Sequence, residues 1–61
     1  MINKEILQVG TKLKIWSNKF NSEQTITIVY KRLNVVFFLY ENNEDDWLPT
    51  GSYIIESASF V

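Results

Sequence analysis

Apolar and polar residues alternate with a period of two in two stretches, a pattern typical of strands with one buried face. In residues 11–16, one side carries Leu13 and Ile15 and the other carries Lys12, Lys14 and Trp16. Residues 24–32 are rich in β-branched side chains, which favours a strand. One side of this second strand is predicted to carry Ile26, Ile28, Tyr30 and Arg32.

Residues 35–40 read Val-Val-Phe-Phe-Leu-Tyr and break this alternation, because both sides of a strand built from them are apolar. The junction at residues 31–34 is short enough for a hairpin, with Asn34 in a left-handed conformation. Periodicity alone does not decide which side of this strand faces inward, so Phe37 and Phe38 are interchangeable at this level. We expect one side to build the core and the other to meet a partner.

The remaining segments are short. Residues 2–9 predict a helical turn or a strand that ends at Gly10, and residues 17–22 predict a polar loop. A charged loop covers residues 41–46, Trp47 and Leu48 form a brief strand, and residues 49–52 turn. A last strand is predicted from Tyr53 to Ser57, with an extension to Phe60.

This pattern predicts a single all-β domain over residues 1–61, with four to five short strands and no helix. The fold class is a small antiparallel SH3-like barrel or a strongly curled sheet, because a flat sheet of this size leaves one apolar face wet. Phe20 and Trp47 lie in or beside loops and are predicted to cover the side of strand 35–40 that does not face the core.

Two segments resemble parts of the SH3 family. Residues 46–56 (DWLPTGSYIIE) resemble its closing segment, in which a hydrophobic-Pro turn leads through a Tyr into the last strand. Residues 36–47 (VFFLYENNEDDW) resemble its acidic loop that runs into a Trp. In that family two strands separate the Trp from the Pro, whereas here Trp47 and Pro49 are almost adjacent, and the N-terminal tyrosine motif is missing. The resemblance implies an SH3-like small barrel, and it does not carry proline-rich peptide binding over to this chain.

The composition argues against an enzyme. The chain has no Cys and no His, which removes the usual thiol nucleophile, the commonest general base and the commonest metal ligands. Its two glycines, Gly10 and Gly51, are too far apart for a phosphate-binding loop, and no cofactor is predicted. The longest apolar run, six residues, is far below the roughly 20 needed to span a bilayer, and we expect a cytoplasmic protein.

The charges are polarised along the chain. Residues 1–32 carry six Lys or Arg and two Glu, whereas residues 33–61 carry five acids and no base. Such polarity is explained either by pairing across strands or by a surface that orients a charged partner. The densest acidic set is predicted to be a solvated turn or a contact loop, and it lacks the spacing of a calcium loop: Glu41, Glu44, Asp45 and Asp46.

The aromatic content favours a binding function. Nine aromatics make up 15% of the chain, more apolar surface than a thin core can hide, and an exposed apolar patch usually marks an interface. The hypothesis is a non-catalytic module that binds another protein, a different one or a second copy. Small size and AT-rich residue usage favour a phage or mobile-element product that modulates a host protein. The predicted contact residues are Phe38, Tyr40, Trp47, Pro49 and Tyr53.

The alternative is a small barrel that binds single-stranded nucleic acid. Two cations beside an aromatic side chain on one face of a strand suit a phosphate backbone with stacked bases. A sequence pI near 5.1 argues against it unless the acids lie elsewhere. The residues proposed for this role are Lys12, Lys14, Trp16 and Arg32.

Overall fold

The computed structural model describes residues 7–61, and five strands and one helical turn account for its regular structure. The elements follow in the order β1 (Lys12–Ser17), β2 (Ser22–Arg32), β3 (Val35–Tyr40), β4 (Asp45–Pro49), α1 (Tyr53–Glu56) and β5 (Ser59–Phe60). The segment predicted for residues 2–9 lies mostly outside the described residues. The single described helix has four residues, so no described helix is long enough to cross a membrane.

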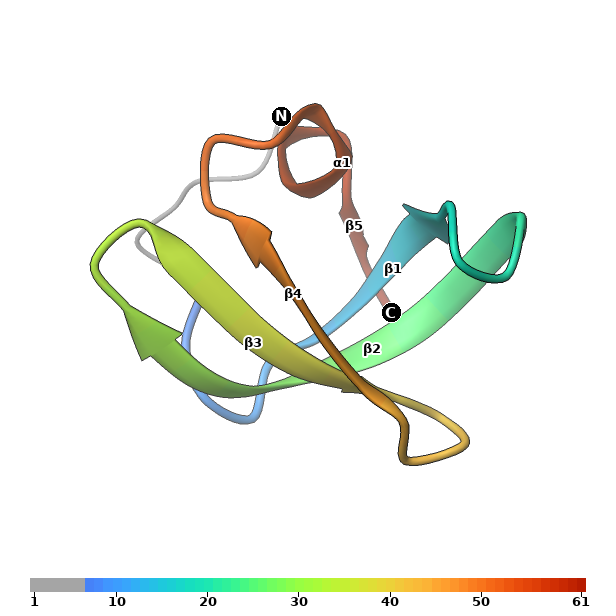
Figure 1. Cartoon of the computed structure of the whole chain (residues 1–61), viewed down its shortest axis with the longest axis horizontal. Coiled ribbons are helices and arrows are strands. Elements are labelled where there is room, and N and C mark those ends of the chain that lie inside the picture. The colour runs from blue at the N-terminus through green and yellow to red at the C-terminus, as the bar shows by residue number, and fades with distance from the viewer. Residues whose placement is uncertain (1–6) are drawn as a thin grey trace.

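All strand pairs are antiparallel, and the five strands form one sheet in the order β4-β3-β2-β1-β5. The sheet curls strongly, as Figure 1 shows, with the long strand β2 passing through its centre. Within the described part of the chain no pairing joins β4 to β5, so the sheet does not close. The prediction of an all-β, strongly curled antiparallel sheet is therefore confirmed.

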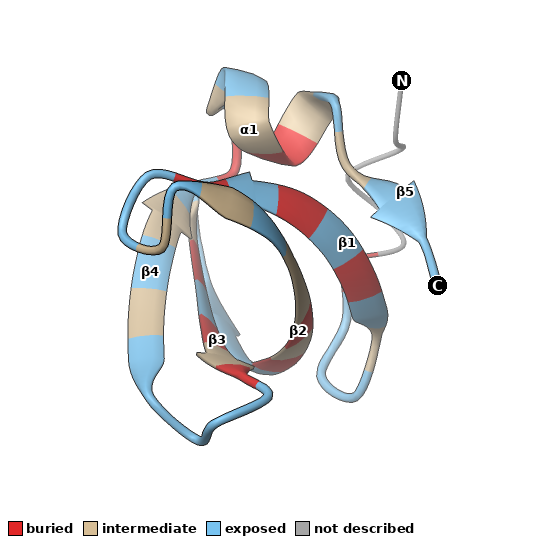
Figure 2. Cartoon of the chain, turned by 90° about the vertical axis from the view of Figure 1, so that its right-hand side faces the viewer, coloured by how far each residue is buried: buried red, intermediate tan, exposed pale blue. Residues whose placement is uncertain are grey.

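The core lies on the concave side of the sheet, under α1 (Figure 2). Along β1 the burial alternates as predicted, with Leu13 and Ile15 buried and the lysines exposed. Phe20 packs against the core from the β1–β2 turn, with its ring 4.8 Å from that of the buried Tyr40, so it does not cover the second side of β3 as predicted. Trp47 lies opposite Phe37 on that second side, but it is 55% exposed and leaves the side partly open. The buried apolar residues are Leu7, Leu13, Ile15, Ile26, Ile28, Val36, Phe38, Tyr40 and Ile55.

A β-bulge in β2 separates two halves of this strand. Ile28 is opposite Phe38, and Tyr30 is opposite the next residue of β3, Phe37, so Val29 is the extra residue. One extra residue reverses the side to which all later residues point. The predicted grouping of Tyr30 with Ile26 and Ile28 is therefore wrong: Tyr30 lies on the convex face and is 53% exposed.

The end of the chain differs from its prediction. Residues 53–56 form the helical turn α1 in place of a strand, and only Ser59–Phe60 pairs as β5. Ser52 is the N-cap, since its hydroxyl accepts a hydrogen bond from the backbone N–H of Ile54 at 3.2 Å. The turn buries Ile55 against the core, and this burial overrides the strand propensity of two consecutive isoleucines.

The opposite environments of two adjacent phenylalanines give a stability prediction. Phe38 is fully buried, whereas Phe37 is 36% exposed on the other face. Phe38→Ala should lower the free energy of unfolding by about 3–5 kcal/mol, a large share of the roughly 3–9 kcal/mol expected for a chain of this length. The matched control Phe37→Ala should cost about 1 kcal/mol. Urea titration followed by circular dichroism checks both, and equal losses would contradict this assignment of faces.

Candidate functional site

Three aromatic side chains form a row across the convex face of the sheet. Tyr30 on β2 is paired with Phe37 on β3, which is paired with Trp47 on β4. The rings of Tyr30 and Phe37 lie 5.6 Å apart, and Tyr30 and Trp47 are each more than half exposed. We call Tyr30, Phe37 and Trp47 the outer aromatic row. The next pairs along the strands, Arg32 with Val35 and Val35 with Pro49, extend the apolar surface toward the β2–β3 turn.

The predicted contact residues divide between core and surface. Phe38 and Tyr40 are buried, with 0% and 4% exposure, so they cannot anchor a partner and their prediction is wrong. The side of β3 that faces solvent carries Phe37 in their place. Trp47, Pro49 and Tyr53 are exposed, and their role in binding remains a prediction. Tyr53 stands on α1, apart from the row.

The turn between β2 and β3 presents an apolar tip. Arg32 pairs with Val35, so the turn consists of two residues, of which Leu33 has a φ of 48°. The prediction that Asn34 takes the left-handed conformation is wrong. Two other non-glycine residues with positive φ are Asn21 and Asn43, and asparagine tolerates this region, whereas leucine pays about 1–2 kcal/mol there.

Leu33 is also 86% exposed, so neither packing nor backbone preference explains its presence at this position. It lines a shallow hollow of about 410 Å³ together with Arg32, Asn34, Val35 and Phe37. A strained, exposed apolar residue beside an exposed aromatic row is an observation that points to binding.

The free edge of β4 offers few backbone N–H groups for strand addition. Tyr40 N–H donates to the Glu44 carbonyl and Thr50 N–H to the Asn34 carbonyl, and hydrogen-bonded pairs alternate between these two ends. The backbone groups of residues 45, 47 and 49 therefore point away from β3. The N–H of Trp47 is already satisfied by the Asp46 carboxylate at 2.8 Å, and Pro49 has no N–H. Two of the three N–H positions that point away from β3 therefore cannot pair with a further strand.

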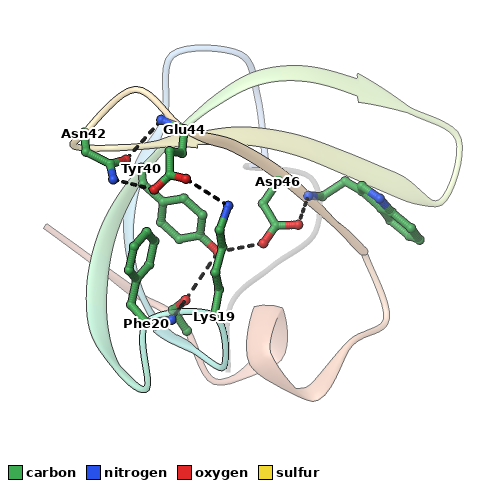
Figure 3. A network of polar contacts seen from close by, with 8 residues as sticks. Lys19, Phe20, Tyr40, Asn42, Glu44 and Asp46 are labelled. Atoms are coloured by element: carbon green, nitrogen blue, oxygen red, sulfur yellow. Dashed lines mark hydrogen bonds and ion pairs between the residues drawn. The ribbon is translucent and has the colours of Figure 1, made fainter.

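Asp46 also ends a polar network on the concave side (Figure 3). The Tyr40 hydroxyl donates to Asp46 Oδ2 at 2.7 Å and accepts from the Ser17 hydroxyl at 3.3 Å. Burial, the bond to Asp46 and the negative charges of Asp46 and Glu44 raise the pKa of Tyr40, against the lowering effect of the Ser17 hydrogen bond. Both oxygens of Asp46 thus accept hydrogen bonds within the fold, and Asp46 lies in β4 and not in a loop as predicted.

The other acids are arranged as a solvated turn. Lys19 pairs with Glu44 at 3.3 Å, and its ammonium lies 5.7 Å from the centre of the Tyr40 ring. A hydrogen bond from Asn42 and the pairing with Lys19 lower the pKa of Glu44. Glu41 is exposed in the turn, and Asp45 is the first residue of β4, not a loop residue as predicted. No group of three or more acidic side chains within residues 7–61 is placed to hold a metal ion.

The residues proposed for nucleic-acid binding are only partly brought together. Lys12, Lys14 and Trp16 share the exposed face of β1 as predicted. Glu23 lies opposite Trp16 and pairs with Lys14 at 3.9 Å, which places a negative charge within this face. Arg32 lies five positions beyond Thr27, the partner of Lys12, roughly 15 Å along β2. Strands β1 and β2 are neighbours, so the inclusion of Arg32 in one extended patch with Lys12 stays a prediction.

Three residues of the site escape the sequence pattern. Tyr30 joins the row because of the bulge at Val29, for which the sequence carries no glycine or other signal. Phe37 is exposed because its neighbours in β3, Val36 and Phe38, face the core. The sequence does not show which side of this strand is buried, because residues on both sides are apolar. Of the three, only the exposure of Leu33 could have been predicted from the sequence, because a residue at the tip of a two-residue hairpin cannot point into the core.

Comparison with protein-family models, curated proteins and solved structures finds no match to this chain. The function must therefore be argued from the site itself.

Strain at the hairpin tip predicts a stabilising substitution. Leu33→Gly should raise the free energy of unfolding by about 0.5–1 kcal/mol, because glycine adopts positive φ freely and its greater entropy when unfolded offsets only part of the gain. Asn43→Gly is the matched control, a change at positive φ where asparagine is already tolerated, and it should have almost no effect. Urea titration of both variants checks this; a loss of stability at Leu33 would contradict the assignment of strain.

The buried tyrosine predicts a specific alkaline response. Because the folded state raises the pKa of Tyr40 above its ordinary value of 10.0, its contribution to stability is complete below that pH and is lost as pH rises through the folded pKa. Tyr40→Phe should cost about 1–2 kcal/mol at neutral pH, since it leaves Asp46 without its donor. It should also reduce the alkaline loss of stability. Urea titrations across the alkaline range compare the two proteins, and parallel losses in both would count against this role.

Proposed function

We propose that this protein is a non-catalytic module that binds another protein through the outer aromatic row. One observation carries the proposal: Tyr30, Phe37 and Trp47 meet on a single face of the sheet and remain substantially exposed. Tyrosine and tryptophan are enriched at binding hot spots because they bury a large area at low entropic cost.

The strained tip supports the same surface. Leu33 retains an unfavourable backbone conformation and an exposed apolar side chain at the border of the row. A partner that covers the side chain removes the cost of its exposure, and this gain offsets the backbone cost, as is common where stability is traded for function. Leu33 therefore offers an apolar contact at the tip of the β2–β3 hairpin, next to Arg32.

The finer architecture and the biological setting belong to the proposal. Four strands, a helical turn after Pro49 and a last strand paired with β1 support an SH3-like arrangement. The resemblance of residues 46–56 agrees with the position of Pro49 and Tyr53 before the last strand. We further propose a cytoplasmic phage or mobile-element protein whose partner is a host protein.

Nucleic-acid binding is the second candidate, supported by the shared exposure of Lys12, Lys14 and Trp16. Phosphate contacts make affinity fall steeply with salt, whereas an aromatic protein interface responds little. Glu23 within this face weighs against it. The two candidates use different strands, so substitutions separate them.

Capture of a partner from lysate tests the proposal with three forms of the chain. Phe37→Asp should abolish capture, while the double charge reversal Lys12→Glu with Lys14→Glu should leave it intact at high and low salt. Circular dichroism must first show that each variant is folded. Capture that survives Phe37→Asp, or that is lost with nuclease treatment and the lysine reversals, would refute protein binding through the row.

A further inference from the structure

Two unpaired charges lie at opposite corners of the apolar surface. Arg32 on β2 and Asp45 on β4 are both exposed, and neither has an ion-pair partner within residues 7–61. Arg32 is in register with Val35, and Asp45 with Leu39, so they flank Phe37 from opposite ends of β3. The two charges therefore mark the ends of a diagonal that passes through the centre of the outer aromatic row.

We propose that the occupant of this surface is a second copy of the same chain, joined face to face about a two-fold axis. An axis that lies in the interface, crosses over Phe37 and runs perpendicular to the diagonal places Arg32 of each copy over Asp45 of the other. The strands of the two sheets then cross at a steep angle, one of the two arrangements that packed sheets adopt. This proposal rests on the proposed function: the second copy covers the outer aromatic row when no host protein does.

The chemistry of the acidic corner suits this arginine. Asp45 and Trp47 alternate on the same side of β4, so a carboxylate stands beside an exposed indole. A guanidinium that reaches this corner can pair with the carboxylate and stack on the indole. Two-fold symmetry makes this contact twice per dimer, while the two aromatic rows cover each other between them.

The size of the surface sets the strength of the dimer. The half-exposed aromatic row with Leu33, Val29, Val35 and Pro49 offers about 500 Å² per copy, or about 1,000 Å² for two, the lower range of specific interfaces. The net charge of −1 opposes association only weakly. We therefore expect a weak, concentration-dependent dimer of the 7.2 kDa chain.

Sedimentation equilibrium of the full chain tests the proposal between about 10 µM and about 1 mM, a range that covers weak affinities. Arg32→Asp and Asp45→Arg each place like charges together twice per dimer and should each raise the dissociation constant about tenfold. The double variant Arg32→Asp with Asp45→Arg restores the pairing and should return to within about threefold of the natural chain. Lys12→Asp is the matched control, the same charge reversal on the exposed face of β1, and should change nothing. All four variants change exposed positions only, so circular dichroism should report native folding.

The possible failures are distinguishable. A monomer at every concentration overturns the second copy as partner and leaves the proposed function to be decided by lysate capture. A dimer that ignores both single reversals, or that the double variant fails to restore, overturns the pairing of Arg32 with Asp45. A dimer that survives Phe37→Asp uses another face of the chain, which refutes this inference, while lysate capture with the same variant decides the proposed function separately.

Discussion

The single extra residue at Val29 determines how this small sheet divides its side chains between two faces. Before the bulge, Ile26 and Ile28 point into the core; after it, Tyr30 points outward, next to Phe37. Bulges also increase local twist and bend the strand, which suits the strongly curved path of β2. If β2 paired regularly, Val29 would lie opposite Phe37 and Tyr30 opposite the buried Val36, so Tyr30 would face inward and the outer aromatic row would lose one of its three rings.

Because the core is thin, the convex face that is proposed for binding also contributes to the stability of the sheet. A chain of 61 residues buries a modest fraction of its surface, so the ring contacts on the convex face also contribute to holding β2 against β3. Any partner that covers Phe37 therefore stabilises the sheet as it binds, by mass action on the folded state. On the concave side, Phe38 and Tyr40 pack edge to face with their ring centres 5.5 Å apart, and they support the sheet beneath the outer aromatic row.

The fold class and most strands could be predicted from the sequence, and the reasons are physical. The buried face of β1 could be assigned from the sequence because lysines alternate with Leu13 and Ile15, which distinguishes the exposed side from the buried side. Strand β3 offered no such contrast, so the choice between Phe37 and Phe38 depended on pairing with neighbours. The helical turn at Tyr53–Glu56 was missed because the Ser52 cap and the burial of Ile55 are tertiary facts, while the isoleucines alone favour a strand. An exposed aromatic surface was predictable from the aromatic content, and Trp47 was among the residues expected there, but Tyr30 and Phe37 were not.

The backbone edge of β4 limits how this chain can associate. Unpaired backbone edges accept further strands and so can lead to fibres. Here two of the three positions of β4 that point away from the sheet offer no N–H, since that of Trp47 is bonded to Asp46 and Pro49 has none. The exposed apolar side chains lie instead on one face of the sheet, and a face that one partner covers is not open to another. This arrangement favours a finite complex over a fibre.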